Sequence, residues 1–540
     1  MRTISPRALL VLSSILVASG CYRSHPIGDA EVPDARRPDA RVPDADLRDA
    51  RVPDADLRDA RVPDADLRDA RVPDADLRDA RVPDADLRDA RVPDAGFTPC
   101  TSDFDCRGVC VRTPGVAPED LAPLALSCGP TSAARSDGDL CSAPADCGRG
   151  LCVVAGSCVA PCAANSDCES GQRCAELWVR TSGSSMQWLY GCVDRVNMPA
   201  DVRVRRVRAG VALASDTPDT FELSSAPGTQ LLVVQPRVPQ TLYASQFRTA
   251  GPAPVMLFDV EGYAGDGPPP LAPFGSFGPL LSILMPNGPR APTSPAGYSL
   301  DLYSESRTPL FVTSLSREGV GTTLDLELFY VGATGLAPMG DRGPPRVAAA
   351  LATVERVFAR LGVRLGEVRQ HLVVGQLRRD FAIIEAAPDG DLPEMPALLH
   401  LSAGAARSSV SIFLVREVDM ALGVAGGIPG PEAMHGTSSS GILIAVDLHD
   451  PVLDDLGLSI AHEIGHFLGL WHTTELDGTI WEPLPDTPRC PLSRDADGDG
   501  YLTADECAGR GGFNLMFWAG VGEGLSPQQA TVLSHAPLLR

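Results

Sequence analysis

Twelve of the fifteen cysteines of this chain lie between Cys100 and Cys192, and they constrain its folding more than any other feature. Gly, Ser, Asp and Ala dominate the residues between them, so the segment has too few large apolar side chains to form a stable core without cross-links. We therefore expect a module at 100–194 that is held by six disulfides and folds in an oxidising compartment. The connectivity does not follow from the sequence.

The spacing of Cys100, Cys106 and Cys110 recurs loosely along the module. The later groups are Cys141, Cys147, Cys152 and then Cys158, Cys162, Cys168, Cys174. Zinc binding by these cysteines is the competing interpretation. It is disfavoured because CxxC pairs and histidines, which are usual in structural zinc sites, are missing from the segment.

The composition excludes several classes of protein. The 540 residues carry a formal net charge of −23, which argues against sequence-general nucleic-acid binding because that requires a basic surface. All 46 basic residues are arginine, so the chain has no lysine for a Schiff base or for a phosphate-binding P-loop. Pyridoxal enzymes and P-loop nucleotide enzymes are therefore excluded.

The N-terminus has the pattern of a secretory signal. Arg2 and Arg7 precede an apolar run at 8–18 that is shorter than the roughly 20 residues needed to span a bilayer. The run leads into Ala18-Ser19-Gly20-Cys21, which resembles the bacterial lipobox, in which the cysteine is lipidated. We expect a lipoprotein signal peptide at 1–20 and a lipid anchor on Cys21 that holds the chain at the outer membrane or cell surface. An ordinary cleaved signal, with Cys21 in a disulfide, is the alternative.

A ten-residue repeat follows the signal. The unit Arg-Val-Pro-Asp-Ala-Asp-Leu-Arg-Asp-Ala runs five times over 41–90 and restarts at Arg91. Each unit offers one Val and one Leu for burial, and its proline interrupts helices and ladders alike, so the repeat cannot form a core. We expect residues 21–99 to be the lipid anchor and a disordered spacer that holds the folded part away from a membrane.

Residues 195–321 form the next region. Alternating apolar runs at 231–234, 255–260 and 298–303 are separated by turns rich in Pro and Gly. Short strands with turns at close spacing are typical of a β-sandwich. We expect a β-sandwich-like, β-rich domain with a structural or substrate-presenting role.

The C-terminal region, 322–540, mixes strands and helices. Leu324, Leu326, Leu328 and Tyr330 recur at every second position and predict an amphipathic strand. Pro344-Pro345 then opens a helix that ends at Gly362, and apolar runs at 409–415 and 441–446 predict further strands. These elements indicate an α+β domain.

The segment His462-Glu463-Ile464-Gly465-His466-Phe467-Leu468-Gly469-Leu470-Trp471-His472 carries the chemistry. His462 and His466 are four residues apart, so both imidazoles project from one face of a helix and can bind one metal ion. Gly469 allows the backbone to turn, which brings His472 to the same ion as a third ligand. Three neutral imidazoles with an open fourth position are typical of catalytic zinc.

Glu463 is the predicted catalytic base of this site. It lies beside the first ligand, where it can accept the proton of a water whose pKa zinc lowers to about 7. An apolar helix with incidental histidines is the alternative interpretation. Five histidines elsewhere in the chain are expected to be structural or surface residues: His371, His400, His435, His449 and His535.

With these eleven residues the chain resembles the metzincin metalloproteases. Downstream, Asn514-Leu515-Met516 is similar to their Met-turn, which implies that Met516 lies beneath the metal. Thr473, Asp486-Thr487-Pro488 and the Asn-Leu-Met form look most like the pappalysin family. The resemblance implies a metzincin-like fold for 322–540. Trp518 departs from the pattern, because many relatives have a tyrosine there to hydrogen-bond the reacting centre.

A calcium loop is predicted between the zinc helix and the Met-turn. Residues 495–506 match the twelve-residue loop at six positions, and the predicted ligands are Asp495, Asp497, Asp499, Tyr501 through its carbonyl, Thr503 and Glu506. An acidic, glycine-rich surface turn is the alternative. Cys490 and Cys507 bracket the loop and are expected to form a disulfide.

These observations predict a zinc endopeptidase, with Zn²⁺ and Ca²⁺ as cofactors, that is anchored at the bacterial cell surface and cleaves protein or peptide substrates. The alternative is a non-catalytic, calcium-binding surface lipoprotein that uses a metzincin-like scaffold for adhesion. The intact Glu463 and three histidines favour the enzyme. The substrate, the cleavage specificity and any latency mechanism stay open.

Overall fold

The computed structural model describes the chain with gaps, and the fold below concerns the described part. The described residues are 20–22, 99–100, 106, 109–113, 124–132, 134, 136–137, 141, 144–153, 158–162, 167–169, 172–180, 186–194, 198–237, 240–262, 268–293, 295–387, 391–405, 408–419, 421–450 and 455–540. The predicted signal peptide and repeat spacer therefore fall outside the description, except for 20–22.

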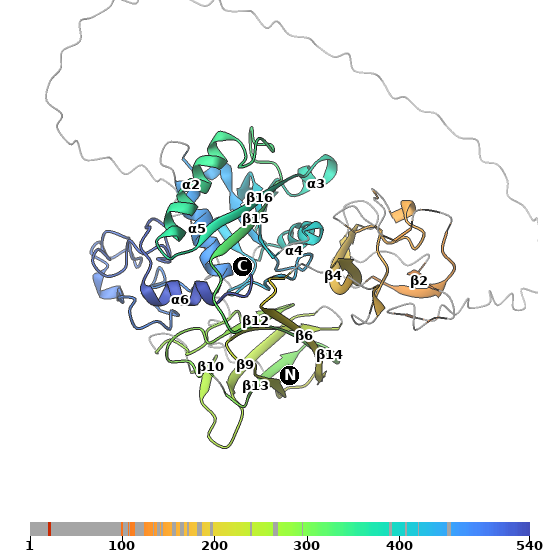
Figure 1. The fold of residues 1–540 in the computed structure, drawn as a ribbon, viewed down its shortest axis with the longest axis horizontal. Helices are drawn as coiled ribbons and strands as arrows, with labels where there is room; N and C mark the ends of the chain where they lie inside the picture. The colour runs from red at the N-terminus through yellow and green to blue at the C-terminus, as the bar shows by residue number, and fades with distance from the viewer. Residues whose placement is uncertain are drawn as a thin grey trace, which may run out of the picture. The chain divides into compact units, whose positions relative to one another are not determined.

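The protein is multidomain and mostly β, with some helices (Figure 1). The predicted disulfide-rich module is confirmed. It contains two short antiparallel pairs, β2 (Val109–Arg112) with β3 (Leu126–Gly129) and β4 (Gln172–Arg180) with β5 (Met186–Asp194). A 3-10 turn, Pro144–Asp146, lies between them.

The disulfides of this module form three units of four cysteines each. Within each unit the first cysteine bonds the third and the second bonds the fourth. The bonds are Cys100–Cys110, Cys106–Cys128, Cys141–Cys152, Cys147–Cys158, Cys162–Cys174 and Cys168–Cys192. These units do not follow the loose spacing pattern of the sequence, because Cys158 closes the second unit and does not open the third.

Residues 202–317 form two antiparallel sheets. The four-stranded sheet has the order β12 (Leu281–Met285), β8 (Thr229–Pro236), β14 (Thr308–Arg317), β6 (Val202–Ala212). The five-stranded sheet has the order β10 (Met256–Asp259), β9 (Leu242–Thr249), β13 (Gly297–Ser304), β7 (Asp219–Ser224), and β11 (Phe277–Gly278) also pairs with β9.

Strand β8 connects two hydrophobic cores. Successive side chains of a strand point to opposite faces of its sheet. Leu232 and Val234 pack into the core between the two sheets, whereas Leu231 and Val233 pack into the core of the C-terminal region. The four-stranded sheet is therefore covered on both faces, and β8 is buried at every position.

The C-terminal region is built on a six-stranded sheet in the order β1-β20-β21-β18-β15-β16. Four strands run parallel: β15 (Thr323–Tyr330), β16 (Arg364–Leu372), β18 (Val410–Val415) and β21 (Ile442–Ala445). β20 (Ala421–Ala425) runs antiparallel to β21, and β1 (Gly20–Tyr22) runs antiparallel to β20.

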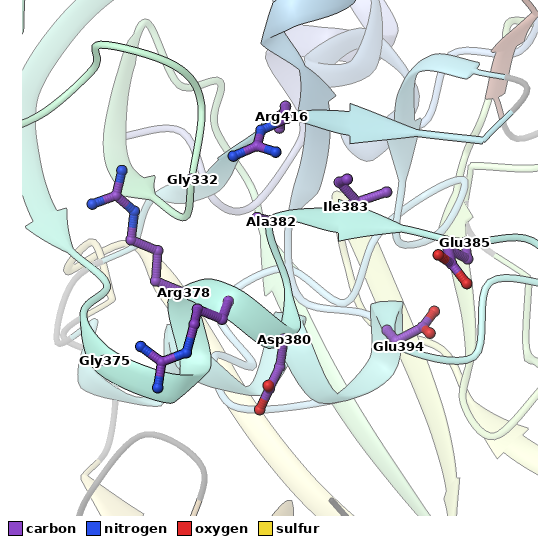
Figure 2. Close-up of a pocket in the computed structure, with 10 residues that line it drawn as sticks. Gly332, Gly375, Arg378, Asp380, Ala382, Ile383, Glu385, Glu394 and Arg416 are labelled. Carbon is purple, nitrogen blue, oxygen red and sulfur yellow. The ribbon is translucent and has the colours of Figure 1, made fainter. Parts of the chain in front are cut away.

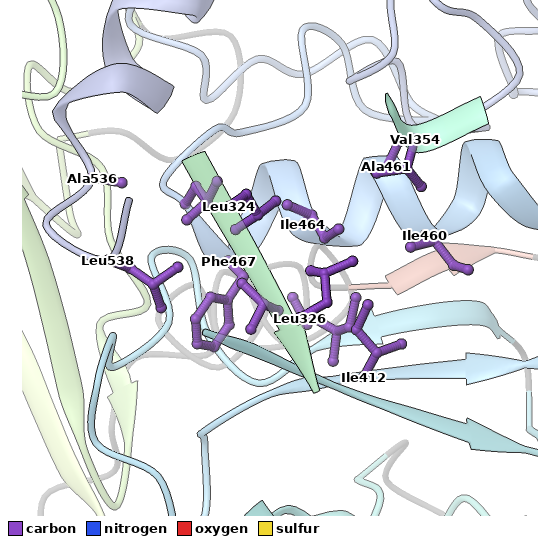
Figure 3. Packing of buried hydrophobic residues seen from close by; sticks show 14 of the residues in the cluster. Leu324, Leu326, Val354, Ile412, Ile460, Ala461, Ile464, Phe467, Ala536 and Leu538 are labelled. Carbon is purple, nitrogen blue, oxygen red and sulfur yellow. The ribbon is translucent and has the colours of Figure 1, made fainter. Parts of the chain in front are cut away.

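Helices cover both faces of this sheet. On one face α2 (Pro345–Ala359) and α5 (Asp455–Phe467) pack together. Figure 3 shows β15, with Leu324 and Leu326, crossing α5 near Ile464 and Phe467. The other face has its own apolar core, to which α4 (Met395–Leu399) and the parallel pair β17 (Ile383–Ile384) with β19 (Glu417–Val418) contribute. The remaining helices are α3 (Gly375–Asp380) and α6 (Pro527–His535), with short 3-10 turns at 400–404, 446–448 and 492–494.

The expectation of an amphipathic strand at Leu324–Tyr330 is wrong. β15 is buried at every position because it lies between β16 and β18 with apolar side chains on both faces. Its two acidic side chains are accommodated by partners. Asp325 receives two hydrogen bonds from Arg540 at 2.7 and 3.0 Å, and Glu327 lies 2.5 Å from Nε2 of His371.

Candidate metal centre

Three histidine nitrogens converge at the C-terminal end of α5. His462 and His466 lie one turn apart on the helix, which ends before Gly469, whose φ of 104° suits glycine. The turn brings His472 back to them. The Nε2 atoms are 2.9 Å apart for His462 and His466, 3.1 Å for His462 and His472, and 3.0 Å for His466 and His472.

Hydrogen bonds on the far side of each ring fix its tautomer. Nδ1 of His462 lies 2.6 Å from the carbonyl oxygen of Leu515, and Nδ1 of His466 lies 2.8 Å from that of Leu470. A carbonyl oxygen can only accept, so each Nδ1 carries the hydrogen and each Nε2 presents a lone pair. Burial also lowers the pKa of His462 to about 3 and that of His466 well below its usual value.

The third ring is oriented by a residue that the sequence reasoning missed. Nδ1 of His472 lies 2.7 Å from Oε2 of Glu475, and both residues are buried. A carboxylate on the outer nitrogen orients a ligand histidine and increases its basicity. The spacing of three residues after His472 is the only signal for Glu475 in the sequence.

The three nitrogens fit a zinc ion. Three atoms about 3.0 Å apart lie about 1.7 Å from their common centre, so a point about 1.1 Å above their plane is about 2.1 Å from all three, which is the Zn–N distance. Three converging lone pairs with no proton between them repel one another unless a cation lies among them. Neutral imidazoles suit zinc, with other first-row metals as competitors.

Glu463 lies beside these ligands and is fully buried. Its side chain packs against β20, where an added Cβ on Gly423 would lie 2.7 Å from Cγ and 2.9 Å from Oε1 of Glu463. Only a glycine therefore leaves room for the glutamate in this position. Gly423 is 40 residues away in the chain, and nothing in the sequence indicated its role.

The segment that resembles a Met-turn lies against α5. An added Cβ on Gly465 would lie 2.6 Å from Sδ of Met516, so the thioether packs directly on α5 between the two histidine ligands. The carbonyl oxygen of Met516 accepts a hydrogen bond from the backbone N–H of Thr473 at 2.8 Å. Oδ1 of Asn514 accepts the N–H of Met516 at 2.8 Å, which holds the turn closed.

The side chain of Trp518 is used in a contact with a distant segment. Its indole N–H donates to the carbonyl oxygen of Leu502 at 2.6 Å, and the residue is buried. Leu502 belongs to the predicted calcium loop. Trp518 therefore joins the Met-turn segment to that loop, and its only N–H donor is used there.

The predicted calcium loop is closed by its own carboxylates. Asp495 accepts the N–H groups of Gly498 at 2.7 Å and Gly500 at 2.8 Å. Glu506 accepts the N–H of Ala496 at 2.6 Å and both the N–H and the hydroxyl of Thr503 at 2.8 Å. These bonds lower the pKa of Glu506.

Three of the six predicted calcium ligands come together among the described residues. Asp495, Asp497 and Glu506 each offer an oxygen within 4.8 Å of the others. Oxygens that bind calcium at 2.3–2.6 Å lie within about 5 Å of one another, so this cluster fits. Of the other predicted ligands, Asp499 uses Oδ1 to accept the N–H of Tyr501 at 2.8 Å, and the hydroxyl of Thr503 donates to Glu506 at 2.8 Å.

The disulfide Cys490–Cys507 is formed next to this loop. Both cysteines are fully buried and pack with Leu502, Phe517 and Trp518. The disulfide therefore joins the two ends of the loop, and a hydrogen bond from Trp518 and this small apolar core hold the loop against the 514–518 segment.

Three further histidines are bound within the fold. His400 and His449 are buried, and each places Nδ1 near a backbone carbonyl oxygen, at 2.6 and 2.9 Å. His435 is buried between the hydroxyls of Ser409 and Ser411. These contacts agree with structural roles.

Cys21, the predicted lipidation site, lies in β1, whose backbone pairs with β20. The pairing joins Gly20 to Val424 and Tyr22 to Ala421. Among the residues that the structure describes, no helix has the length and apolar character needed to cross a bilayer.

Comparison with known proteins gives little beyond the repeat. A family model described as pentapeptide repeats matches eight copies over residues 43–79 and 55–92, which lie in the repeat spacer and outside the described residues. No curated protein sequence matches the chain.

Among solved structures, the chain is similar to a family two carbohydrate esterase from Cellvibrio japonicus, at 10% identity and a TM-score of 0.11, over 40% of this chain and 67% of the esterase. It is also similar to an active-site mutant of a family two carbohydrate esterase from Clostridium thermocellum, at 7% identity and a TM-score of 0.10, over 40% of this chain and 66% of that one. Both TM-scores are too low to indicate a shared fold.

Proposed function

We propose that this protein is a zinc-dependent endopeptidase with a metzincin-like catalytic domain at 322–540. The observation that carries the proposal is the convergence of three Nε2 lone pairs, from His462, His466 and His472, beside the buried carboxylate of Glu463. A closed structural zinc site has four protein ligands, whereas this cluster offers three and leaves a position open.

Different residues of the chain have different roles in the proposed hydrolysis. When bound, zinc supplies a Lewis acid at the three histidines and lowers the pKa of water to about 7. Glu463 accepts the proton of the attacking water and returns it to the departing amine. Glu475, Leu515 and Leu470 hold the imidazoles in the tautomer that leaves Nε2 without a proton.

Strand β20 offers a place for an extended substrate. Its outer edge pairs with the backbone of Gly20–Tyr22, an extended segment of the chain itself, and a substrate strand would take the place of that segment. Gly423 lies in the same strand and touches Glu463. A polypeptide paired with β20 therefore passes the catalytic base, which supports a peptide substrate recognised through its backbone.

We assign supporting roles to the remaining predicted features. Calcium bound by Asp495, Asp497 and Glu506 stiffens the loop that Trp518 attaches to the Met-turn. A lipid on Cys21 anchors the chain at the outer membrane or cell surface, and the repeat spacer extends the folded part from it. The second candidate, a non-catalytic calcium-binding adhesion lipoprotein, requires the same loop but not Glu463.

Cleavage of a denatured protein substrate tests the enzyme against the adhesion protein. We expect the wild type and the exposed-site control Glu261→Gln to cleave it at the same rate. Glu463→Gln and chelator-treated wild type should be inactive. Added zinc should restore the activity of the chelator-treated wild type. Equal cleavage by the wild type and Glu463→Gln rejects the proposal.

A further inference from the structure

A second pocket lies at the carboxyl ends of β15 and β18. It has a volume of about 780 Å³, and Gly332, just after β15, and Arg416, just after β18, line it. Helix α3, the segment around β17 and Glu394, just before α4, complete its wall. None of its lining residues belongs to the metal centre. The carboxyl ends of parallel strands are where open α/β sheets usually bind ligands, and the volume is within the range of small-molecule sites.

Charges of opposite sign line different ends of this pocket. Figure 2 shows Arg378 and Arg416 toward Gly332, and Glu385 and Glu394 at the other end. A ligand that spans the pocket thus meets guanidinium groups at one end and carboxylates at the other.

The groups at both ends have unused hydrogen-bonding capacity within the described residues. The side chains of Arg378 and Arg416 make no hydrogen bond or ion pair there, although Arg379 and Asp380 in the same wall do have partners. The Oε2 atom of Glu394 is buried and has no hydrogen-bond partner. A buried carboxylate oxygen without a donor is costly, so its position favours a ligand that brings one.

We propose that this pocket binds a dipolar ligand, with a carboxylate held by Arg378 and Arg416 and an ammonium group held by Glu385 and Glu394. Guanidinium groups bind carboxylates with two parallel hydrogen bonds, and an ammonium group supplies the donors that Glu394 lacks. A short peptide with both ends unblocked has these two groups at separated positions. The choice of peptides within this class rests on the proposed function, because such peptides are the products of an endopeptidase.

Calorimetric titration of the full chain with tri-alanine tests the pocket. The chain carries Glu463→Gln to prevent turnover, and the titration is repeated in the presence of a chelator to separate this pocket from the metal centre. We expect saturable binding in both conditions. N-acetylation or C-amidation of the tripeptide should weaken binding about tenfold or more, since each removes one charged partner.

Pocket variants complete the test. Arg416→Gln and Glu394→Gln should each weaken binding of the unblocked tripeptide about tenfold or more. Arg205→Gln, which changes an exposed arginine of β6 outside the pocket, should bind as the parent does. Absence of saturable binding, equal binding of the blocked peptide, or unchanged binding by both pocket variants overturns the proposal. Because an inactive chain is used, this result is independent of whether the protein proves to be a protease.

Discussion

Replacing Gly423 with alanine places a methyl group against the side chain of Glu463. The added Cβ lies 2.7 Å from Cγ and 2.9 Å from Oε1 of Glu463, whereas carbon atoms in contact are about 3.5–4.0 Å apart. β20 is held by its pairing with β21, so the glutamate must yield. Its carboxylate is therefore displaced by about 1 Å.

The size of the effect follows from this displacement. A misplacement of about 1 Å costs about 100-fold in rate, and the whole contribution of a general base is about 10²–10⁴-fold. We expect kcat of Gly423→Ala to fall about 100-fold. Zinc binding should be unchanged, because the three atoms nearest to the added Cβ all belong to Glu463 and none to a histidine.

The assay measures kcat on a peptide substrate together with the zinc content of the same sample. Gly275→Ala is the matched control, since its added Cβ meets no atom within 4 Å. Full activity of Gly423→Ala at normal zinc content would refute Glu463 as a base held in this position. Loss of zinc together with activity would show that the variant disrupts the centre as a whole, which also contradicts the reasoning.

Three further predictions concern the metal sites and the pH dependence of stability. Glu475→Gln removes the charge that orients His472, so zinc affinity measured by chelator competition should fall about 10–100-fold; an unchanged affinity contradicts this. The double variant Asp497→Ala, Glu506→Gln should lose the calcium-induced rise in Tm that the wild type shows, and retention of that rise rejects the site. Burial raises the pKa of Glu432 to about 8, so the folded chain keeps a proton that the unfolded chain releases above about 4.5. Its contribution to stability therefore decreases as pH rises from about 4.5 to 8. Over this range the Tm of Glu432→Gln should increase relative to the Tm of the wild type, because the variant has no carboxyl group to ionise. Tm profiles that stay parallel contradict the assignment.

The parts of the candidate site that the sequence revealed are local in the chain. His462, Glu463, His466 and His472 lie within eleven residues, and the 3.6-residue period of a helix places the first two ligands on one face. Gly469 indicated the turn because few other residues tolerate its positive φ. Short-range geometry of this kind is independent of the rest of the fold.

Other contacts of the site join distant segments. Gly423 reaches Glu463 through the pairing of β20 with β21, and the carbonyl of Leu515 accepts from a histidine 53 residues earlier. The alternation at Leu324–Tyr330 predicted one buried face, but both faces are buried because neighbouring strands and helices enclose β15. No residue near β15 in the chain indicates those neighbours.

The sequence by itself determined the multidomain, disulfide-rich character of the protein and the residues that can bind metal, because cysteine content and helical spacing act within short segments. Only the tertiary structure decided how the twelve cysteines of the 100–192 module pair, which strands are enclosed, and how Trp518 connects the 514–518 segment to the acidic loop. These features depend on contacts between segments that are far apart in the chain. The spacing of residues along one sequence does not specify such long-range contacts.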